Sequence, residues 1–398
     1  MISLYNIFLN NNKLTNLYTS LNIFHSFSIL INIMSNKNKK NNEIMDKCVL
    51  MFVLHALGDT IGFKNSDWKL DYGKPAEIGS INEFVYEFID LGGINGIDLQ
   101  GWNISSDTIY HTAIANSVLT FNKKINKKLI VKTKNNIILA YNRIFGDKKN
   151  GIDRSNETTT KKYLEKFSLD TDASNLPYDK KSGGNGVASR SLCIGLAFNK
   201  STDIDKLTHN SPLGYLSGLT TAYFVSLAFQ EININKWPHM LINLLESNSV
   251  KKYIDTTITE IQFDYMDYIR YWKKYIDTRF VDDKPIKSRS TSNLIFRTKY
   301  YYENFVKDTN FPGIAVSGFC AVIIAYDALL DCDGIWEKII FYAILNPSDS
   351  SVVGAIAGGL FGAVYGIGDV PKNMIEKVEE YNNLEKIGKS YYKKFLKK

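Results

Sequence analysis

The chain has 398 residues and a net charge of +7, with 44% hydrophobic, 13% aromatic and 22% charged residues. This length allows one large domain or two, and the apolar and aromatic content excludes a wholly disordered chain. The excess of lysine lies in residues 1–44 and 386–398, while the body between them is close to neutral. A nucleic-acid-binding domain usually carries its positive charge on one folded face, so no nucleic-acid partner is expected.

Cysteines and long apolar runs indicate the compartment. Cys48, Cys193, Cys320 and Cys332 have neither C-x-x-C spacing nor a histidine at zinc-finger distance, which argues against a zinc site or a disulfide framework. We expect buried thiols in a reducing, cytoplasmic compartment. The best membrane candidate, residues 21–34, is interrupted by Asn, His and Ser and is shorter than the roughly 20 apolar residues that a spanning helix needs. No membrane partner is therefore expected.

Residues 1–44 differ in composition from the rest of the chain. They contain the asparagine run 10–12 and the Asn/Lys tract 36–42. Tracts of this kind are typical of disorder. The sequence predicts a low-complexity, flexible extension over 1–44, with one weak helix in its middle, and a folded domain over 45–398.

Helical spacing of apolar residues dominates this domain. A first helix is predicted to begin near Asp46, the expected N-cap. Further helices are predicted over 109–121, 129–144, 186–198, 212–229, 235–245, 255–275, 318–330, 335–345, 350–365 and 372–395. Alternating strand patterns are scarce, so the predicted fold class is all-α, a compact single domain of many helices. The polar segments 146–183 and 282–293 are predicted to be surface excursions.

Two of these helices, 212–229 and 350–365, are apolar on nearly every face, so they should be central. Gly354, Gly358, Gly359 and Gly362 lie along the second one. Each glycine costs a helix interior up to about 1 kcal/mol relative to alanine. Close approach of another helix is the expected compensation, and a cofactor loop is the alternative.

Two acid-bearing turns precede buried helices. Ser105, Ser106, Asp107 and Thr108 open the helix near 109, and the sequence Asn-Pro-Ser-Asp-Ser-Ser at 346–351 opens the helix near 350. Such oxygens either cap the helix or bind a hard cation such as Mg²⁺. The two turns could form one site if the fold brings them together.

A third segment, 182–190, is a glycine-rich turn that leads into a helix. Its free N–H groups and the helix dipole suit a phosphate. The candidate ligand-binding residues are Gly184, Asn185, Gly186, Val187 and Arg190. Neither a Walker loop nor the strand of a dinucleotide fingerprint accompanies them. His209, farther on, is either a structural hydrogen-bonding group or a base.

Together these segments resemble the ADP-ribosylglycohydrolase family, nearest its ADP-ribosylarginine hydrolase branch, from about residue 45 to 395. The motifs that carry the resemblance are Gly58-Asp59-Thr60-Ile61-Gly62, Leu91-Gly92-Gly93, Ser105-Ser106-Asp107-Thr108-Ile109, Cys193-Ile194-Gly195-Leu196, Thr208-His209 with Pro212, Gly214 and Tyr215, Ile324-Ala325-Tyr326-Asp327-Ala328, and Ala355-Ile356-Ala357-Gly358.

The resemblance implies an all-α domain, expected to be a monomer, that holds two Mg²⁺ ions in a cleft. It implies cleavage of the glycosidic bond between ADP-ribose and a protein side chain, arginine in the nearest branch. The partner would be ADP-ribose or an ADP-ribosylated protein. By the same resemblance, Ser105, Asp107 and Asp349 are the metal ligands, and Asp107 and Asp349 are the catalytic residues.

The sequence departs from the family pattern at the metal site. Ser106 and Ser351 stand where the family has Asp, and Val352 stands where it has a hydroxyl residue. Lys69 replaces a Glu, and a Gly-His-Asp motif is Gly-Phe-Cys at 318–320. Because affinity for hard cations depends on the number of charged ligands, we expect one Mg²⁺ bound weakly, or none. A hydrolase, an impaired relative that binds ADP-ribose or a protein partner, and a scaffold that keeps only the fold therefore stay open.

Overall fold

The computed structural model describes residues 17–68, 78–120, 127–155, 158–166, 178–197, 209–254, 258–288 and 290–397. Contacts divide the chain into two units, Met1–Ile44 and Met45–Lys398. The candidate site lies entirely in the second unit, and the flexibility of residues 1–44 stays a prediction. Lys69 and the predicted helix ends at 121, 198 and 255 lie outside the described residues.

The all-α fold class is confirmed. The larger α-helices are α2 (Leu17–Phe63), α3 (Ile78–Asp90), α5 (Ser106–Leu119), α6 (Lys127–Lys149), α7 (Thr158–Lys166), α10 (Pro212–Phe229), α11 (Trp237–Leu245), α13 (Thr259–Arg279), α14 (Leu294–Phe305), α15 (Gly318–Asp331), α17 (Ser350–Tyr365) and α19 (Tyr381–Tyr391). Shorter helices are α4 (Gly93–Gly96), α8 (Gly186–Arg190), α9 (Leu192–Ala197), α12 (Asn248–Tyr253), α16 (Trp336–Ile339) and α18 (Lys372–Glu376). Within the described residues, strands are limited to β1 (Phe280–Val281) and β2 (Lys284–Pro285), which pair antiparallel.

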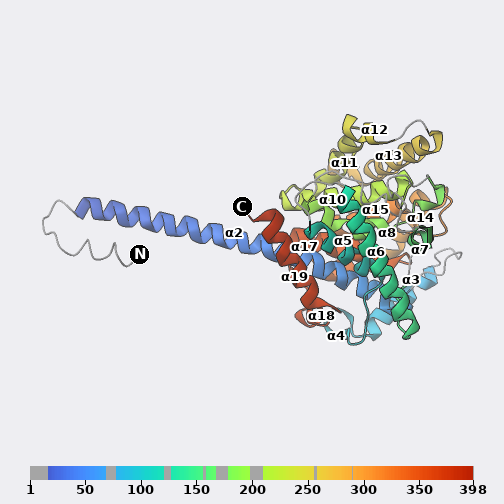
Figure 1. Cartoon of the computed structure of the whole chain (residues 1–398), viewed down its shortest axis with the longest axis horizontal. Helices are drawn as coiled ribbons and strands as arrows, with labels where there is room; N and C mark the ends of the chain where they lie inside the picture. The colour runs from blue at the N-terminus through green and yellow to red at the C-terminus, as the bar shows by residue number, and fades with distance from the viewer. Residues whose placement is uncertain are drawn as a thin grey trace. The chain divides into compact units, whose positions relative to one another are not determined.

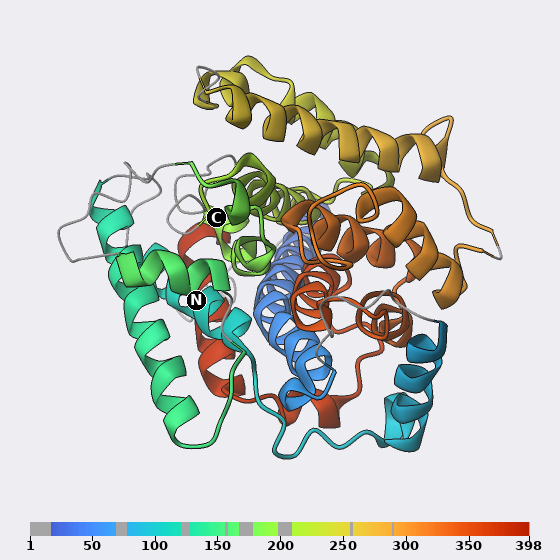
Figure 2. The same ribbon diagram turned by 90° about the vertical axis from the view of Figure 1, so that its right-hand side faces the viewer.

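Helices α2 and α17 form a close antiparallel seam in the middle of the second unit, where α2 is blue and α17 orange-red (Figure 2). A Cβ atom on Gly58 would overlap the carbonyl of Gly354, and one on Gly354 would overlap Gly58. The remaining backbone contacts repeat at four-residue steps: Gly62 with Ser350, Gly358 with Leu54, and Gly362 with Leu50. The predicted role of the glycines in close helix approach is confirmed.

Helices α10 and α15 complete the core around this seam. Helix α10 is buried along most of its length and packs on α8, α9, α13, α15 and α17 (Figure 1). Ser211 caps it through a hydrogen bond from the Leu213 N–H, and Pro212 occupies the first turn, where a missing N–H costs nothing. All four cysteines are buried free thiols, and burial raises the pKa of Cys320 to about 12. Among the described residues, no helix meets the length and hydropathy that a membrane crossing requires.

Several helix limits differ from the prediction. Asp46 lies inside α2 rather than at its start, because the part of the helix before Gly58 contains neither glycine nor proline to interrupt it. The segment 372–395 is broken between α18 and α19, where Glu380 takes a positive φ of 63°. The predicted helix 186–198 is two short helices, α8 and α9, which meet at Ser191.

Two further helices, α3 and α14, were not predicted. The segment 146–183 is not wholly a surface excursion either, since it contains α7 and the buried side chain of Arg154.

A buried cluster of four charges joins α13, α14 and α15. The guanidinium groups of Arg279 and Arg297 each contact both Asp327 and Asp331, at N–O distances of 2.7 Å. All four side chains are at most 7% exposed. Burial by itself would raise the pKa of Asp327, but the two arginines lower it to about 2. Burial and the neighbouring Asp327 raise the pKa of Asp331 despite the two arginines, so the positive charge compensates Asp327 more fully than Asp331.

Candidate functional site

The first acid-bearing turn opens α5. The Ser105 side chain caps the helix by accepting a hydrogen bond from the Asp107 N–H at 3.1 Å. The Ser105 hydroxyl in turn donates to Oδ2 of Asp107 at 3.2 Å. The capping interpretation of this turn is thus confirmed for Ser105, and the carboxylate of Asp107 is held above the first turn of the helix.

Asp59 of α2 accepts hydrogen bonds from the same turn. Its Oδ2 atom accepts hydrogen bonds from the Ser105 N–H (2.9 Å), the Thr108 N–H (3.3 Å) and the Thr108 hydroxyl (2.6 Å). The side chain is fully buried, and loss of solvent outweighs these bonds, so the pKa of Asp59 is raised to about 6. Asp59 therefore ties the central seam to the position of the first acid.

Arg154 and Glu379 also bind this turn, through the backbone of Ile104. Arg154 donates to both carboxylate oxygens of Glu379, at 2.6 and 2.8 Å, and to the carbonyl of Ile104 at 2.8 Å. Glu379 also accepts from the Ile104 N–H at 2.9 Å. Burial acts to raise the pKa of Glu379, but these contacts keep it below the usual value.

The side chain of Ser106 contributes no oxygen to the cleft. Its hydroxyl, 3% exposed, donates to the carbonyl of Ser155 at 2.7 Å. The Ser106 N–H donates to the carbonyl of Arg154 at 2.8 Å. Both the hydroxyl and the N–H of Ser106 are therefore hydrogen-bonded to the neighbouring backbone.

The second acid-bearing turn opens α17 and differs from the first. Asp349 occupies the N-cap position but makes no side-chain capping hydrogen bond. Its N–H donates to the Ile314 carbonyl at 3.3 Å. Its Oδ1 accepts from the Ser351 hydroxyl at 3.3 Å, and its Oδ2 accepts from the Asn185 side-chain amide at 2.8 Å. The carboxylate thus contacts the glycine-rich turn through one oxygen and Ser351 of its own helix through the other.

Helix α8 brings the two acids to one place. Asn185, its N-cap residue, contacts Asp349, and the Ser189 hydroxyl donates to Oδ1 of Asp107 at 2.6 Å. Residues four apart on a helix lie on the same face. Both carboxylates therefore lie along one turn of α8, and α5, α8 and α17 pack against one another, as Figure 1 shows.

The glycine-rich turn itself is anchored to the segment before α15. The Gly318 N–H donates to the Gly183 carbonyl at 3.0 Å, and Gly184 forms an antiparallel bridge with Ser317. The second amide hydrogen of Asn185 goes to the Ala315 carbonyl at 2.7 Å. Because backbone bonds hold it on both sides, the turn is a rigid platform for the acids.

The predicted ligand residues divide into two groups. Gly184 is partly accessible, whereas Asn185, Gly186, Val187 and Arg190 are buried. Arg190 contacts protein groups: it donates to Thr160 at 3.1 Å, lies 3.0 Å from Nδ1 of His209, and covers the Tyr110 ring at 5.5 Å. The structure thus places Asn185 in contact with Asp349, with Gly184 next to it in the chain, and Arg190 in the supporting core.

The described residues do not fit a centre of two divalent ions. They contain no cluster of three or more His, Cys, Asp or Glu side chains that could hold a metal. The two acids of the cleft already accept hydrogen bonds from serine and asparagine, and the Ser106 hydroxyl is bound to a carbonyl. Hard cations need several charged oxygen ligands, and this cleft offers two carboxylates.

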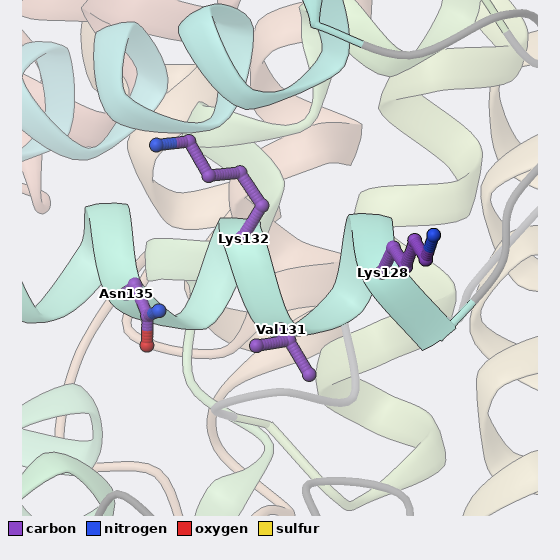
Figure 3. Close-up of a pocket in the computed structure, with 4 residues that line it drawn as sticks. All are labelled: Lys128, Val131, Lys132 and Asn135. Atoms are coloured by element: carbon purple, nitrogen blue, oxygen red, sulfur yellow. The ribbon is translucent and has the colours of Figure 1, made fainter.

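A separate depression of about 290 Å³ lies on the surface of α6 and is lined by Lys128, Val131, Lys132 and Asn135. All four residues come from one helix, and Figure 3 shows the two lysines pointing in different directions. A binding site normally has polar groups that converge. This depression therefore does not compete with the acid cleft.

Sequence reasoning missed three residues that hold the cleft. Asp59 could have been found from the sequence, because it is an acid within the mostly apolar run 48–63. Glu379 could not, because its contact with Ile104 crosses 275 residues. Nothing in the sequence singled out Ser189 either, because its contact with Asp107 forms only when α8 packs against α5.

Comparison with known proteins identifies the family of this chain. The model of the ADP-ribosylglycohydrolase family matches residues 40–398. A protein described as a putative ADP-ribosyl glycohydrolase from Acanthamoeba polyphaga mimivirus is 32% identical over 85% of this chain and 68% of its own length. An ADP-ribosylhydrolase of Dictyostelium discoideum is 27% identical over 92% of this chain and 99% of its own length.

A solved structure described as an ADP-ribosylglycohydrolase-related protein complex has a TM-score of 0.54 at 14% identity. It covers 89% of this chain and 100% of the solved chain, and this likeness concerns the fold alone. On the family match and the mimivirus relative, the chain belongs to the ADP-ribosylglycohydrolase family.

Proposed function

We propose that this chain binds ADP-ribose in the cleft between α5, α8 and α17 and removes it from modified protein side chains, arginine above all. The observation that carries this proposal is the placement of Asp107 and Asp349 along one turn of α8. The partly accessible Gly184 gives the neighbouring turn a backbone approach for phosphate. An intracellular location and a monomeric state stay predictions.

The chemistry follows from the two carboxylates. Hydrolysis joins a water oxygen to the anomeric carbon of the ribose and breaks the bond to the side-chain nitrogen, which leaves with a proton. One carboxylate takes the proton of the attacking water, and the other stabilises positive charge on the sugar ring. Paired carboxylates perform this division of roles in many glycoside hydrolases.

The test is release of free ADP-ribose from an ADP-ribosyl-arginine substrate. Asp107→Asn and Asp349→Asn should each reduce the rate about 100-fold or more, the usual contribution of a positioned acid or base. Asp267→Asn is the matched control, because Asp267 lies on the exposed surface of α13 beside Arg270. Release by the parent no faster than by the double variant Asp107→Asn/Asp349→Asn would contradict hydrolysis.

A second function is favoured by one specific observation. Ser106 and Ser351 are neutral, and Ser351 donates a hydrogen bond to Asp349 where an acid would share a cation. A protein with this cleft can recognise ADP-ribose without turning it over. Calorimetric titration separates the alternatives: binding of ADP-ribose without release from the substrate supports a recognition module, and no binding at millimolar ligand excludes both.

A further inference from the structure

Every carboxylate oxygen in the cleft accepts a hydrogen bond from a neutral side chain. The donors and acceptors are Ser189 Oγ to Asp107 Oδ1 (2.6 Å), Ser105 Oγ to Asp107 Oδ2 (3.2 Å), Asn185 Nδ2 to Asp349 Oδ2 (2.8 Å) and Ser351 Oγ to Asp349 Oδ1 (3.3 Å). The two shortest bonds come from α8. These four donors carry no charge.

We propose that Asn185 and Ser189 are positioning residues that hold the two acids where a divalent cation would otherwise do so. The cleft of this chain is therefore assembled without Mg²⁺. This inference deepens the proposed function and rests on it only for treating the cleft as the ligand site.

The two donors are built for this role. Asn185 is 4% exposed and Ser189 is fully buried, so water competes little for their bonds. Hydrogen bonds to a charged acceptor are about twice as strong as those between neutral groups. The Ala315 carbonyl fixes the amide of Asn185 at 2.7 Å, and the Gly186 carbonyl lies 3.0 Å from the Ser189 hydroxyl. Neither donor needs to reorganise to reach its acid.

A cation entering the cleft would have to compete with these donors. Direct coordination would take the oxygens of Asp107 and Asp349 away from Ser189 and Asn185. The Ser189 hydroxyl could then donate to the Gly186 carbonyl at 3.0 Å, but one amide hydrogen of Asn185 would lose its acceptor in a buried place, which is costly. In return the cation would gain two carboxylates, fewer than a tight hard-cation site uses. The balance favours the hydrogen-bonded cleft.

The experiment measures thermal stability and Mg²⁺ binding in the full chain. In the parent, Tm in millimolar Mg²⁺ should equal Tm in EDTA at matched ionic strength, because a cation that does not bind the folded state cannot stabilise it. In Asn185→Ala/Ser189→Ala the two acids lose their donors, so Tm should fall in EDTA and recover in Mg²⁺. Calorimetry should show Mg²⁺ binding to the double variant at millimolar concentrations at which the parent shows none.

Two single substitutions at α8 give matched controls. Ser191→Ala removes another buried serine hydroxyl of the same segment, one that donates to the Val187 carbonyl at 2.6 Å. It should not create a response to Mg²⁺. Ser189→Thr keeps a hydroxyl donor and should retain the behaviour of the parent, whereas Ser189→Ala should show part of the Mg²⁺ response.

Two results would overturn the inference: a parent whose Tm rises by several degrees in Mg²⁺, or α8 variants that respond to Mg²⁺ no more than Ser191→Ala does. If the double variant does not fold, Ser189→Ala and the parent still decide the matter. No ADP-ribose is present in these measurements. Failure of the proposed function would appear as absent ligand binding with the Mg²⁺ results intact.

Discussion

Two pairs of aspartates in this molecule are held by opposite means. Asp327 and Asp331 are buried between two arginines, each of which contacts both carboxylates. Asp107 and Asp349 accept hydrogen bonds from serine and asparagine. The first pair lies between two positive charges within the fold, whereas each carboxylate oxygen of the second accepts a hydrogen bond from a neutral side chain.

This difference separates a structural site from a reactive one. A carboxylate saturated by arginine is stabilised as an anion and has little capacity left for a ligand. A carboxylate held by neutral donors has its position fixed while its charge stays available for a proton or for positive charge on a substrate. The family motif Asp327 belongs to the first kind, although its sequence context alone did not reveal this.

The largest expected effect comes from removing one arginine of the structural pair. Arg297→Ala leaves Asp327 and Asp331 with half of their compensation in a buried place. It should lower the free energy of unfolding by about 3–5 kcal/mol, because an unpaired buried charge is expensive. Denaturant unfolding measures this loss.

Arg270→Ala is the control for that substitution. Its partner Asp267 lies one turn away on the solvent face of α13, and both side chains are about half exposed. The change should be below about 1 kcal/mol. Equal losses in the two variants would remove the distinction between a saturated buried cluster and a surface pair.

Asp59 should give the next largest effect, visible as a pH dependence. Its pKa is about 6 in the folded chain against an ordinary value of 3.8. Between these two pKa values Asp59 holds a proton in the folded chain that it has already released in the unfolded chain. The stabilisation that comes from this proton is present below about pH 4 and is lost as the pH rises through 6. Relative to Asp59→Asn, the parent should lose about 2–3 kcal/mol of stability from pH 4 to pH 7.

Denaturant unfolding of the parent and of Asp59→Asn at several pH values makes this measurement. Taking the difference between the two proteins cancels the contribution of all other titrating groups. A flat difference would show that Asp59 is ionised throughout, held by its three hydrogen-bond donors.

A smaller effect should distinguish the two serines that replace acids. Ser351→Asp places a carboxylate beside Asp349, and it should tighten Mg²⁺ binding by about ten-fold because ligand charge sets affinity. Ser106→Asp should give no such gain and should destabilise the chain, since its side chain meets the Ser155 carbonyl. Calorimetry with Mg²⁺ on both variants checks this, and equal gains would mean that position 106 can face the cleft.

The smallest effect concerns a buried histidine pair behind the cleft. Among the described residues, neither ring nitrogen of His111 has a hydrogen-bond partner, while the ring stacks on Phe52 at 5.2 Å. Burial and the neighbouring His55 lower its pKa, so it is neutral. His111→Phe should raise the free energy of unfolding by about 1 kcal/mol, because two unsatisfied atoms are removed.

His55→Phe should have the opposite effect on the free energy of unfolding. Nε2 of His55 lies 2.8 Å from the Ser189 carbonyl, so the substitution should destabilise the chain. Denaturant unfolding of both variants at neutral pH shows whether each substitution raises or lowers the free energy of unfolding. A gain from both would mean that the bond to Ser189 contributes nothing.

The fold class and the two acid-bearing turns could be predicted because they depend on local pattern, whereas the meeting of the turns at one place could not. Helical periodicity revealed α10 and α17, and the glycine spacing of α17 indicated its close contact. Helix α14 escaped because aromatic and charged residues obscure its apolar face, so no element was predicted between residue 293 and the helix at 318.

The partners of the acids could not be predicted in the same way. Asp107 contacts Ser189 across 82 residues, and Asp349 contacts Asn185 across 164. No local spacing encodes such pairs, because chain topology decides which helices meet. The role assigned to Arg190 illustrates the same limit, since the direction of its side chain away from the cleft depends on His209 and Thr160.

The seam between α2 and α17 has a consequence for how this chain can change. Its contacts at Gly58, Gly354 and Gly358 are made by backbone atoms, and none of them uses a side chain of the cleft. Ser351 can therefore be exchanged for an acid, or one of the two acids for serine, without loosening the seam that presents them. A protein built in this way can gain or lose reactivity through a few substitutions while its architecture stays the same.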